Sequence, residues 1–228
     1  MDNNSLRYKR ISVFVGHYGS GKTNIALNYA LMLKEKEEKV SIADLDIVNP
    51  YFRTQDSKEM LKNADIKLIS SEFAGSNVDL PALPPDVYSL FDNKDTFGVL
   101  DVGGDDRGAL ALGRYTEGIT KENDCDVFFV INKYRPLTKT PELTMEVLRE
   151  VEDASGIKIT GLINNSNLGE ITTAEDVEES AGYADEVSKL SGLPVVYTTV
   201  HRSIAESVSL KNVMPIKLYV KQTWQDKA

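Results

Sequence analysis

The residues that could carry out chemistry begin with a glycine-rich segment, which reads G-H-Y-G-S-G-K-T over residues 16–23. Its glycines let the backbone adopt conformations that a Cβ would forbid, so successive N–H groups can face an anion. The start of a following helix adds positive potential behind these donors. Lys22 could then reach the terminal phosphates of a nucleotide, and the Thr23 hydroxyl could bind a bridging Mg²⁺. The predicted nucleotide-binding residues here are Gly16, His17, Gly19, Ser20, Gly21, Lys22, Thr23 and Asn24.

The context of this segment supports its interpretation as a P-loop. A short apolar, β-branched run precedes it at residues 11–15, and a helical pattern follows at residues 24–33. A phosphate-binding P-loop requires this order of strand, loop and helix. The alternative is a glycine-rich turn that precedes a lysine by chance, which is expected in about one chain in a hundred of this length. The sequence therefore predicts nucleotide-phosphate binding.

An acidic stretch, A-D-L-D at residues 43–46, lies where an apolar strand is expected to end. Asp44 and Asp46 would project from the same side if the strand geometry persists, because side chains alternate with a period of two. At the ligand end of a sheet, these acids could hold water on magnesium and orient a water against the terminal phosphate. The alternative interpretation is an Asx turn that leaves the strand.

A second stretch, F-G-V-L-D-V-G-G at residues 97–104, places Asp101 at the end of a buried apolar strand. A buried carboxylate is costly unless it is paired or close to a metal. In P-loop enzymes this is the position of the acid that accepts a hydrogen bond from magnesium-bound water. Gly103 and Gly104 permit a backbone that swings toward the γ-phosphate, as in a nucleotide-driven switch. Residues 105–107 are assigned no role in this switch.

Length and composition fit one soluble α/β domain that spans residues 1–228. The formal net charge of −9 argues against non-specific binding to DNA or to an anionic membrane, and no basic patch stands out. The single cysteine, Cys125, excludes an internal disulfide and a cluster held by several thiolates of one chain. No apolar run approaches the length of a membrane span, so we expect a cytoplasmic protein.

The elements that must position these residues alternate along the chain. Strand-like runs occupy residues 10–15, 39–43, 66–70, 97–102, 126–132, 158–164 and 194–199. The clearest helical patterns between them cover residues 140–155 and 173–190. This alternation predicts a doubly wound, mostly parallel α/β sheet with helices on both faces. Ligands of such sheets bind at the carboxyl ends of the strands.

Together these motifs resemble the deviant P-loop ATPases (SIMIBI type), a class that contains MinD, the ParA partitioning ATPases, the nitrogenase iron protein and the CooC nickel-insertion ATPases. The resemblance spans residues 10–205 and includes G-L-I-N-N-S-N at 161–167. It implies an ATPase that binds Mg²⁺ and ATP or ADP and works as a nucleotide switch. It also implies a homodimer formed through the P-loop face and an unidentified protein client.

The resemblance also implies a role for individual residues. Asp46 would position the attacking water, Asp44 would lie near magnesium, and Gly104 would be the switch glycine. Asn165 would contact adenine, since a side-chain amide can pair with both a donor and an acceptor. The alternative is that Asn165 caps a strand-to-loop turn. The implied catalytic residues are Lys22, Asp46 and Asp101, and the implied magnesium ligands, partly through water, are Thr23, Asp44 and Asp101.

Three departures from the class are informative. MinD and ParA carry a lysine where this chain has His17, which is shorter, so trans-activated hydrolysis of that kind is not expected. The loop is closer to the hydrogenase and urease nickel-chaperone GTPases, but those read guanine with N-K-x-D. Here the element is N-K-Y-R at residues 132–135, which favours adenine because the acceptor carboxylate is missing. The tail, residues 209–228, is typical of a final strand or packing segment and not of a membrane anchor.

Three alternatives remain open. The first is a small-molecule phosphotransferase or ligase, in which Arg53, Arg107 or Arg135 would hold an anionic acceptor. The second is a GTPase or ATPase chaperone for metallocentre assembly, although Cys125, His17 and His201 are the only soft or imidazole ligands. The third is a non-enzymatic nucleotide-bound scaffold. By position alone, residues 49–53 and 71–85 are the expected client-facing surfaces.

Overall fold

A computed structural model of the chain describes residues 8–37, 39–46, 58–70, 85–104, 106–122 and 124–219. Several residues named above lie outside this part of the chain. They are Arg53, the expected client-facing residues 49–53 and 71–84, Asp105, and the tail after residue 219. The side chains of Asp106 and Arg107 also lie outside it.

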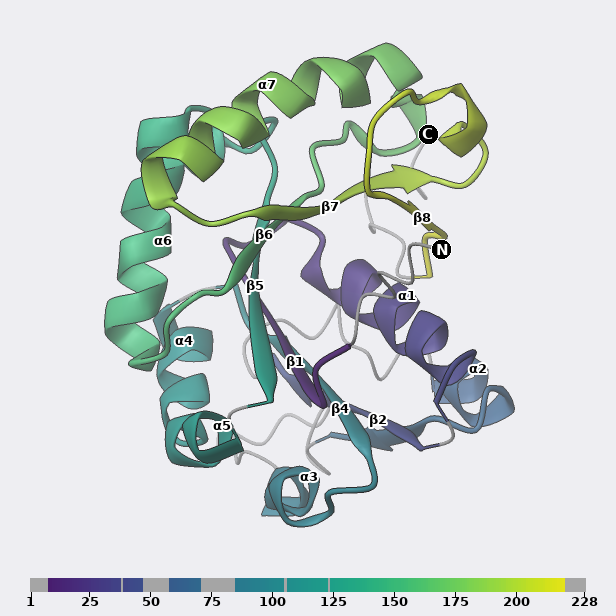
Figure 1. Ribbon diagram of the computed structural model, residues 1–228, viewed down its shortest axis with the longest axis vertical. Coiled ribbons are helices and arrows are strands. Elements are labelled where there is room, and N and C mark those ends of the chain that lie inside the picture. Colours follow the sequence, from purple (N-terminus) through teal and green to yellow (C-terminus); the bar gives the residue numbers. More distant parts are fainter. Residues whose placement is uncertain are drawn as a thin grey trace, which may run out of the picture.

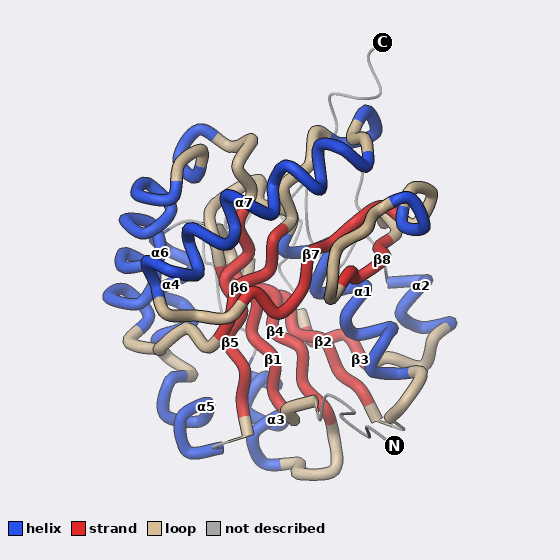
Figure 2. Tube along the Cα trace, turned by 45° about the horizontal axis from the view of Figure 1, so that its top comes forward, coloured by secondary structure: helices blue, strands red, loops and turns tan. Residues whose placement is uncertain are grey.

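The described strands form one eight-stranded sheet in the order β3-β2-β4-β1-β5-β6-β7-β8. Every paired strand runs parallel to its neighbour. The predicted doubly wound α/β architecture is therefore confirmed (Figures 1 and 2). The strands are β1 Ile11–Val15, β2 Val40–Leu45, β3 Lys67–Ile69, β4 Phe97–Val102, β5 Cys125–Ile131, β6 Gly161–Asn164, β7 Val195–His201 and β8 Val213–Ile216.

Helices cover both faces of the sheet (Figure 1). One face carries α1 Lys22–Lys34 and α2 Lys58–Asn63. The other carries α3 Tyr88–Asp92, α4 Asp106–Gly113, α5 Thr116–Glu122, α6 Pro141–Ser155 and α7 Ala174–Ser191. Four short 3₁₀ turns complete the described elements: Pro85–Val87, Pro136–Thr138, Gly169–Ile171 and Ala205–Ser207.

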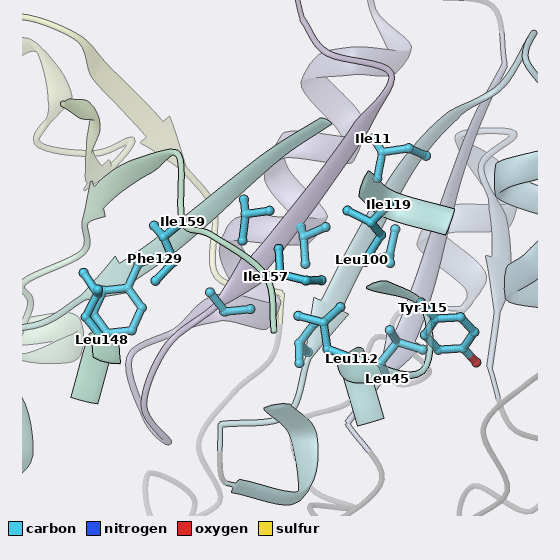
Figure 3. Close-up of a cluster of buried hydrophobic side chains, with 14 of the residues drawn as sticks. Ile11, Leu45, Leu100, Leu112, Tyr115, Ile119, Phe129, Leu148, Ile157 and Ile159 are labelled. Atoms are coloured by element: carbon cyan, nitrogen blue, oxygen red, sulfur yellow. The ribbon is translucent and has the colours of Figure 1, made fainter. Parts of the chain in front are cut away.

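The strand sequences are almost continuously apolar because both faces of the sheet are buried. In β1, Ile11, Val13 and Val15 point into the core under α3–α7, whereas Phe14 points into the core under α1. Figure 3 shows the first of these cores, in which Ile11 and Phe129 from the strands meet α-helical side chains such as Leu112. Alternation within each strand therefore divides the apolar residues between two cores.

The two long helices begin and end as the sequence predicts. Thr140 caps α6 by accepting a hydrogen bond from the Leu143 amide, and Gly156 ends the helix in the left-handed conformation. Helix α7 begins with a reciprocal capping box between Thr173 and Asp176. These helices support the strands whose carboxyl ends form the candidate site.

Three strand boundaries differ by two residues or more from those predicted, and one of them is the end of β7, which continues to His201 and not to residue 199. Strand β6 begins at Gly161 and not at residue 158, since the Val127 amide donates to the Thr160 hydroxyl (2.9 Å) and not to a backbone carbonyl. Strand β2 continues to Leu45, two residues further than predicted. As a consequence Asp44 lies within the sheet, and its neighbour on β4 is Asp101.

Candidate functional site at the carboxyl edge of the sheet

The P-loop lies at the centre of the carboxyl edge, between β1 and α1. Its three glycines have positive φ values of 141° at Gly16, 76° at Gly19 and 93° at Gly21. A side chain at Gly16 would collide with the neighbouring strand, because an added Cβ would lie 2.5 Å from the Val130 carbonyl oxygen. All three glycines therefore adopt backbone conformations that residues with a Cβ rarely adopt.

Lys22 is the first residue of α1, and its side chain is buried against the loop. Its Nζ donates a hydrogen bond to the His17 carbonyl oxygen (3.1 Å). Thr23 follows in the first helical turn, where its hydroxyl is at the positive end of the helix. Two loop amides also bond within the protein: Tyr18 N donates to the Gly104 carbonyl (2.9 Å) and Ser20 N to the His17 carbonyl (3.1 Å).

Asp44 and Asp101 are adjacent in the sheet and both are buried. Asp101 is also in register with Phe14 on β1, whose side chain faces α1. Because register partners in a parallel sheet point to the same face, both carboxylates lie on the face that α1 covers. The strand ends therefore bring two buried acids to the side of the sheet where Lys22 and Thr23 begin their helix.

Asp46 follows the end of β2, and its amide donates to Asp44 Oδ1 (3.0 Å). This is the local contact of an Asx turn, the alternative raised for D-L-D. The Asp46 carboxylate nonetheless faces the second motif, since a Cβ added at Gly103 would lie 3.2 Å from Asp46 Oδ1. A turn and a position beside the switch segment therefore coexist, and the role of Asp46 in positioning water stays a prediction.

The D-V-G-G segment is docked directly on the P-loop. A Cβ added at Gly104 would lie 2.6 Å from Lys22 Nζ and 2.6 Å from the Tyr18 amide nitrogen. Only glycine permits this approach of the two backbones. A movement of the D-V-G-G segment at Gly104 would therefore change the surroundings of the Lys22 ammonium.

On the other side of the P-loop, a cavity of about 400 Å³ opens between the start of α1 and the loops that follow β5–β8. It lies beside Gly19 and Gly21 of the loop, and neither Asp44 nor Asp101 is among its lining residues. Its lining comprises Gly19, Gly21, Asn24, Arg135, Asn165, Asn167, Gly169, Glu170, Thr172, His201, Ser203, Ile204, Lys217 and Leu218. We call it the nucleoside cavity.

Asn165 lines this cavity, and its side-chain amide is bound to protein groups there. Its Nδ2 donates to the Ser20 carbonyl (2.6 Å), and its Oδ1 accepts from the Thr199 hydroxyl (2.5 Å). A Cβ at Gly21 would collide with this Nδ2. Asn165 thus connects the end of β6 to the P-loop, and its contact with adenine stays a prediction.

Arg135 is brought to the P-loop by the loop after β5. Its Nε donates to the Gly19 carbonyl (2.8 Å), so its guanidinium group lies against the loop at the cavity wall. The preceding Tyr134 has a raised pKa because its phenol is desolvated, and it donates a hydrogen bond to the Asp176 carbonyl (3.4 Å). The N-K-Y-R element thus marks a loop that reaches the P-loop, although the sequence did not indicate the contact between Arg135 and Gly19.

Many of the lining residues were not predicted from the sequence to bind nucleotide, among them Glu170, His201 and Lys217. Glu170 follows β6, His201 is the last residue of β7 and Lys217 follows β8, and no motif spacing connects them. Asn24, which we predicted to bind nucleotide, lines the cavity and also accepts a hydrogen bond from the Tyr219 amide (2.8 Å).

A second cavity of about 340 Å³ lies on the switch side of the P-loop. Its lining includes His17, Tyr18 and Gly104 from the two motifs and Leu137 and Glu150 from the α6 region. Among the described residues, no group of three or more His, Cys, Asp and Glu side chains forms a metal cluster. Within the same part of the chain, no helix combines the length and apolar character needed to cross a bilayer.

Fold and site together define a P-loop nucleotide-binding protein of the nucleoside triphosphatase type. Residues 11–184 match the model of the CobQ/CobB/MinD/ParA nucleotide binding domain, and the chain belongs to that family. No curated protein matches the sequence.

Similar solved structures include FtsY from Thermotoga maritima, at 19% identity and a TM-score of 0.59, covering 83% of this chain and 61% of that one. FtsY from Elizabethkingia anophelis in complex with GDP has 16% identity, a TM-score of 0.57, and coverages of 88% and 60%. The 54 kDa signal recognition particle protein from Aeropyrum pernix, also in complex with GDP, has 17% identity, a TM-score of 0.56, and coverages of 85% and 42%. The chain therefore spans less than two thirds of these proteins, and the likeness concerns the fold.

Proposed function

We propose that this protein is a magnesium-dependent ATPase that works as a nucleotide switch. The observation that carries the proposal is the docking of Gly104 on Lys22, beside a P-loop whose glycines adopt the required backbone. A phosphate in the loop would meet the Lys22 ammonium and the helix start from one side and the D-V-G-G segment from the other. The lysine that would bind the phosphate is thus in direct contact with the segment that would act as the switch.

In this proposal, different residues of the chain bind the phosphate, orient the attacking water and respond to the γ-phosphate. Lys22 and the loop amides stabilise phosphate charge, which is the main contribution to catalysis of phosphoryl transfer. Asp46 accepts a hydrogen bond from the attacking water and orients it. Gly104, whose carbonyl oxygen accepts a hydrogen bond from Tyr18 N, shifts when a γ-phosphate enters.

The donor set fits magnesium. Thr23 offers a hydroxyl, and Asp44 and Asp101 are adjacent buried carboxylates, so all three provide the hard oxygen ligands that Mg²⁺ prefers. These residues would hold the ion, partly through water, and the ion would neutralise phosphate charge when bound. Two neighbouring buried acids are also a reason for a cation here, because like charges in a buried place disfavour one another.

The central experiment is calorimetric titration of Mg·ATP into the wild type and into Lys22→Ala. We expect Lys22→Ala to weaken binding by at least about a hundredfold, since a buried charge-assisted contact to phosphate is lost. Lys34→Ala is the matched control, because Lys34 is in the last turn of the same helix and pairs with Asp65 (3.0 Å) at the surface. Equal affinity of wild type and Lys22→Ala would refute the proposal.

Adenine is the proposed base, because the carboxylate of N-K-x-D is replaced by Arg135 and Asn165 lines the cavity. Guanine is the second candidate. Glu170 provides a carboxylate at the cavity wall, which could accept from the guanine N1–H and amino groups, and two of the similar structures carry GDP. Competition between ATP and GTP for the wild type decides between them. A preference for GTP that disappears in Glu170→Gln would identify guanine.

We also propose a homodimer formed through the P-loop face. Two apolar side chains on the rim of the switch-side cavity are about half exposed, Tyr18 at 49% and Leu137 at 51%. A partner of the same sequence would cover them, consistent with the dimers that the family resemblance implies. Light scattering with a non-hydrolysable ATP analogue should show twice the monomer mass, and a monomer with bound analogue would contradict the dimer.

A further inference from the structure

A short segment after β8 is fastened to the P-loop helix by two asparagines. We call residues 217–219 the C-terminal strap; β8 itself lies beside α1 (Figures 1 and 2). Asn28 Nδ2 donates to the Lys217 carbonyl (2.8 Å), and Asn28 Oδ1 accepts from the Lys217 amide (2.9 Å). One turn earlier, Asn24 Oδ1 accepts from the Tyr219 amide (2.8 Å). The two side chains therefore bind alternate amides of the strap, as a neighbouring strand would.

Asn28 is unusual in its surroundings. It is 7% exposed and lies in a helix whose neighbouring residues, Leu27 and Tyr29, are buried in the apolar core. A buried amide in such a place is costly unless its donors and acceptor are satisfied. Among the described residues, Asn28 Nδ2 donates a hydrogen bond to one further group besides the strap, the Asn24 carbonyl (2.6 Å). The strap is what makes this polar residue favourable there.

The strap is also a wall of the nucleoside cavity. Lys217 and Leu218 line it, together with Gly19 and Gly21 from the P-loop. Asn24 lines the cavity too and holds the strap at the same time. The Lys217 ammonium lies over the Tyr219 ring, 5.4 Å from its centroid, so the strap also carries a cation. A nucleoside in the cavity would therefore be in contact with the strap.

We propose that the C-terminal strap is a nucleotide-binding element, with Asn28 as the residue that positions it. This inference rests on the proposed function and adds the nucleoside end of the site to it. Since the docked strap completes the cavity, nucleotide binding and strap docking stabilise each other. Linkage requires the two effects to be equal, so undocking the strap weakens nucleotide binding by the factor by which nucleotide strengthens docking.

A pair of full-length variants isolates the main-chain bond. Lys217→Pro removes the amide that donates to Asn28, whereas Lys217→Ala removes the same side chain and keeps that amide. We expect Lys217→Pro to bind the preferred Mg·nucleotide about tenfold more weakly than Lys217→Ala, because the strap would then have to be ordered when nucleotide binds. Inorganic tripolyphosphate, which does not fill the cavity, should bind both variants equally. Equal nucleotide affinity of the two variants, or a matching loss for tripolyphosphate, would overturn the inference.

A double-mutant cycle tests whether Asn28 acts through the strap. Asn28→Ala should weaken nucleotide binding about tenfold in the otherwise natural chain and have a much smaller effect in Lys217→Pro, which keeps only the carbonyl that accepts from Asn28 Nδ2. A full additional loss in that background would show that Asn28 acts on the helix, and would overturn its positioning role.

Hydrogen exchange supplies a readout that does not depend on substitutions. Nucleotide should slow exchange of the Lys217 and Tyr219 amides, both of which are bonded to asparagine side chains. Exchange unchanged by saturating nucleotide would refute coupling. If the wild type binds no nucleotide at all, the proposed function fails; if it binds but the strap variants bind equally well, only the strap inference fails.

Discussion

The two sides of the P-loop are built in different ways. On the phosphate side, Asp44 and Asp101 belong to adjacent strands, and Gly104 follows two residues after β4. On the nucleoside side, the cavity is lined from Gly19 to Leu218 by residues at or beyond the ends of five strands, β1 and β5–β8. The phosphate side is positioned by the strands of the sheet, whereas the nucleoside side is formed by loops that contact one another.

This difference implies different consequences of substitution. Groups at strand ends are fixed by a hydrogen-bonded ladder, so changing one of them should alter chemistry without altering the fold. The loops of the nucleoside side are held through Asn165, Arg135 and Asn28, each bonded to a backbone carbonyl elsewhere in the chain. Changes there should alter affinity and stability more than turnover.

The largest effect on the phosphate side is expected from Asp46→Asn. An amide keeps the shape of the side chain but is a much weaker acceptor for a proton from water, so turnover should fall about a hundredfold. ATP affinity should stay within about threefold of the wild type, because the charge-binding groups are unchanged. Phosphate release and calorimetry measure the two quantities. Asp185→Asn on the exposed face of α7 is the control, and equal turnover would clear Asp46 of this role.

Gly104→Ala should reduce turnover about thirtyfold through the close approach of the two backbones. The added Cβ would lie 2.6 Å from the Tyr18 amide nitrogen, which cannot move away as a flexible side chain could. ADP affinity should change little, because the proposed switch responds to the γ-phosphate, which ADP lacks. Gly182→Ala is the matched control, since a Cβ there meets nothing within 4 Å. Wild-type turnover in Gly104→Ala would show that docking is not required.

The placement of the P-loop and of the acids at the carboxyl edge could be predicted from the sequence, for a physical reason, whereas their roles stay predictions. A strand followed by glycines, or by an acid, places that residue at the carboxyl edge whatever the rest of the fold does. Asp44, Asp101, Lys22 and Gly104 were located in this way. The register that puts Asp44 beside Asp101 was not predictable, because β2 continues two residues further than its apolar pattern indicates.

The nucleoside side was largely inaccessible to the same reasoning. Asn165 was found through its resemblance to a family motif, whereas its bond to Ser20 depends on how β6 and the P-loop are placed. Lys217 reaches the cavity from a part of the chain 189 positions after Asn28. No local pattern records a contact over that separation, so only the fold reveals it.

Arg135→Ala sharpens the comparison on the nucleoside side. Loss of the guanidinium hydrogen bond to the Gly19 carbonyl (2.8 Å) should weaken nucleotide binding about fivefold, while turnover at saturation stays within about twofold. Arg149→Ala on the exposed side of α6 is the control. If Arg135→Ala instead lowers turnover tenfold at saturation, Arg135 acts on the reacting phosphates and the division between the two sides is wrong.

The smallest effect is expected from Thr199→Val, which preserves side-chain volume and removes one hydroxyl. Thr199 is buried, and its hydroxyl donates to Asn165 Oδ1 (2.5 Å) and to the Asn164 carbonyl (3.4 Å). Without this donor a buried amide oxygen loses its partner, which should lower the free energy of unfolding by about 1–2 kcal/mol in urea titrations. Nucleotide affinity should fall about twofold, because Asn165 keeps its bond to the P-loop. A large loss of affinity with unchanged stability would mean that the Thr199 hydroxyl, and not Asn165, orders the loop that meets the nucleoside.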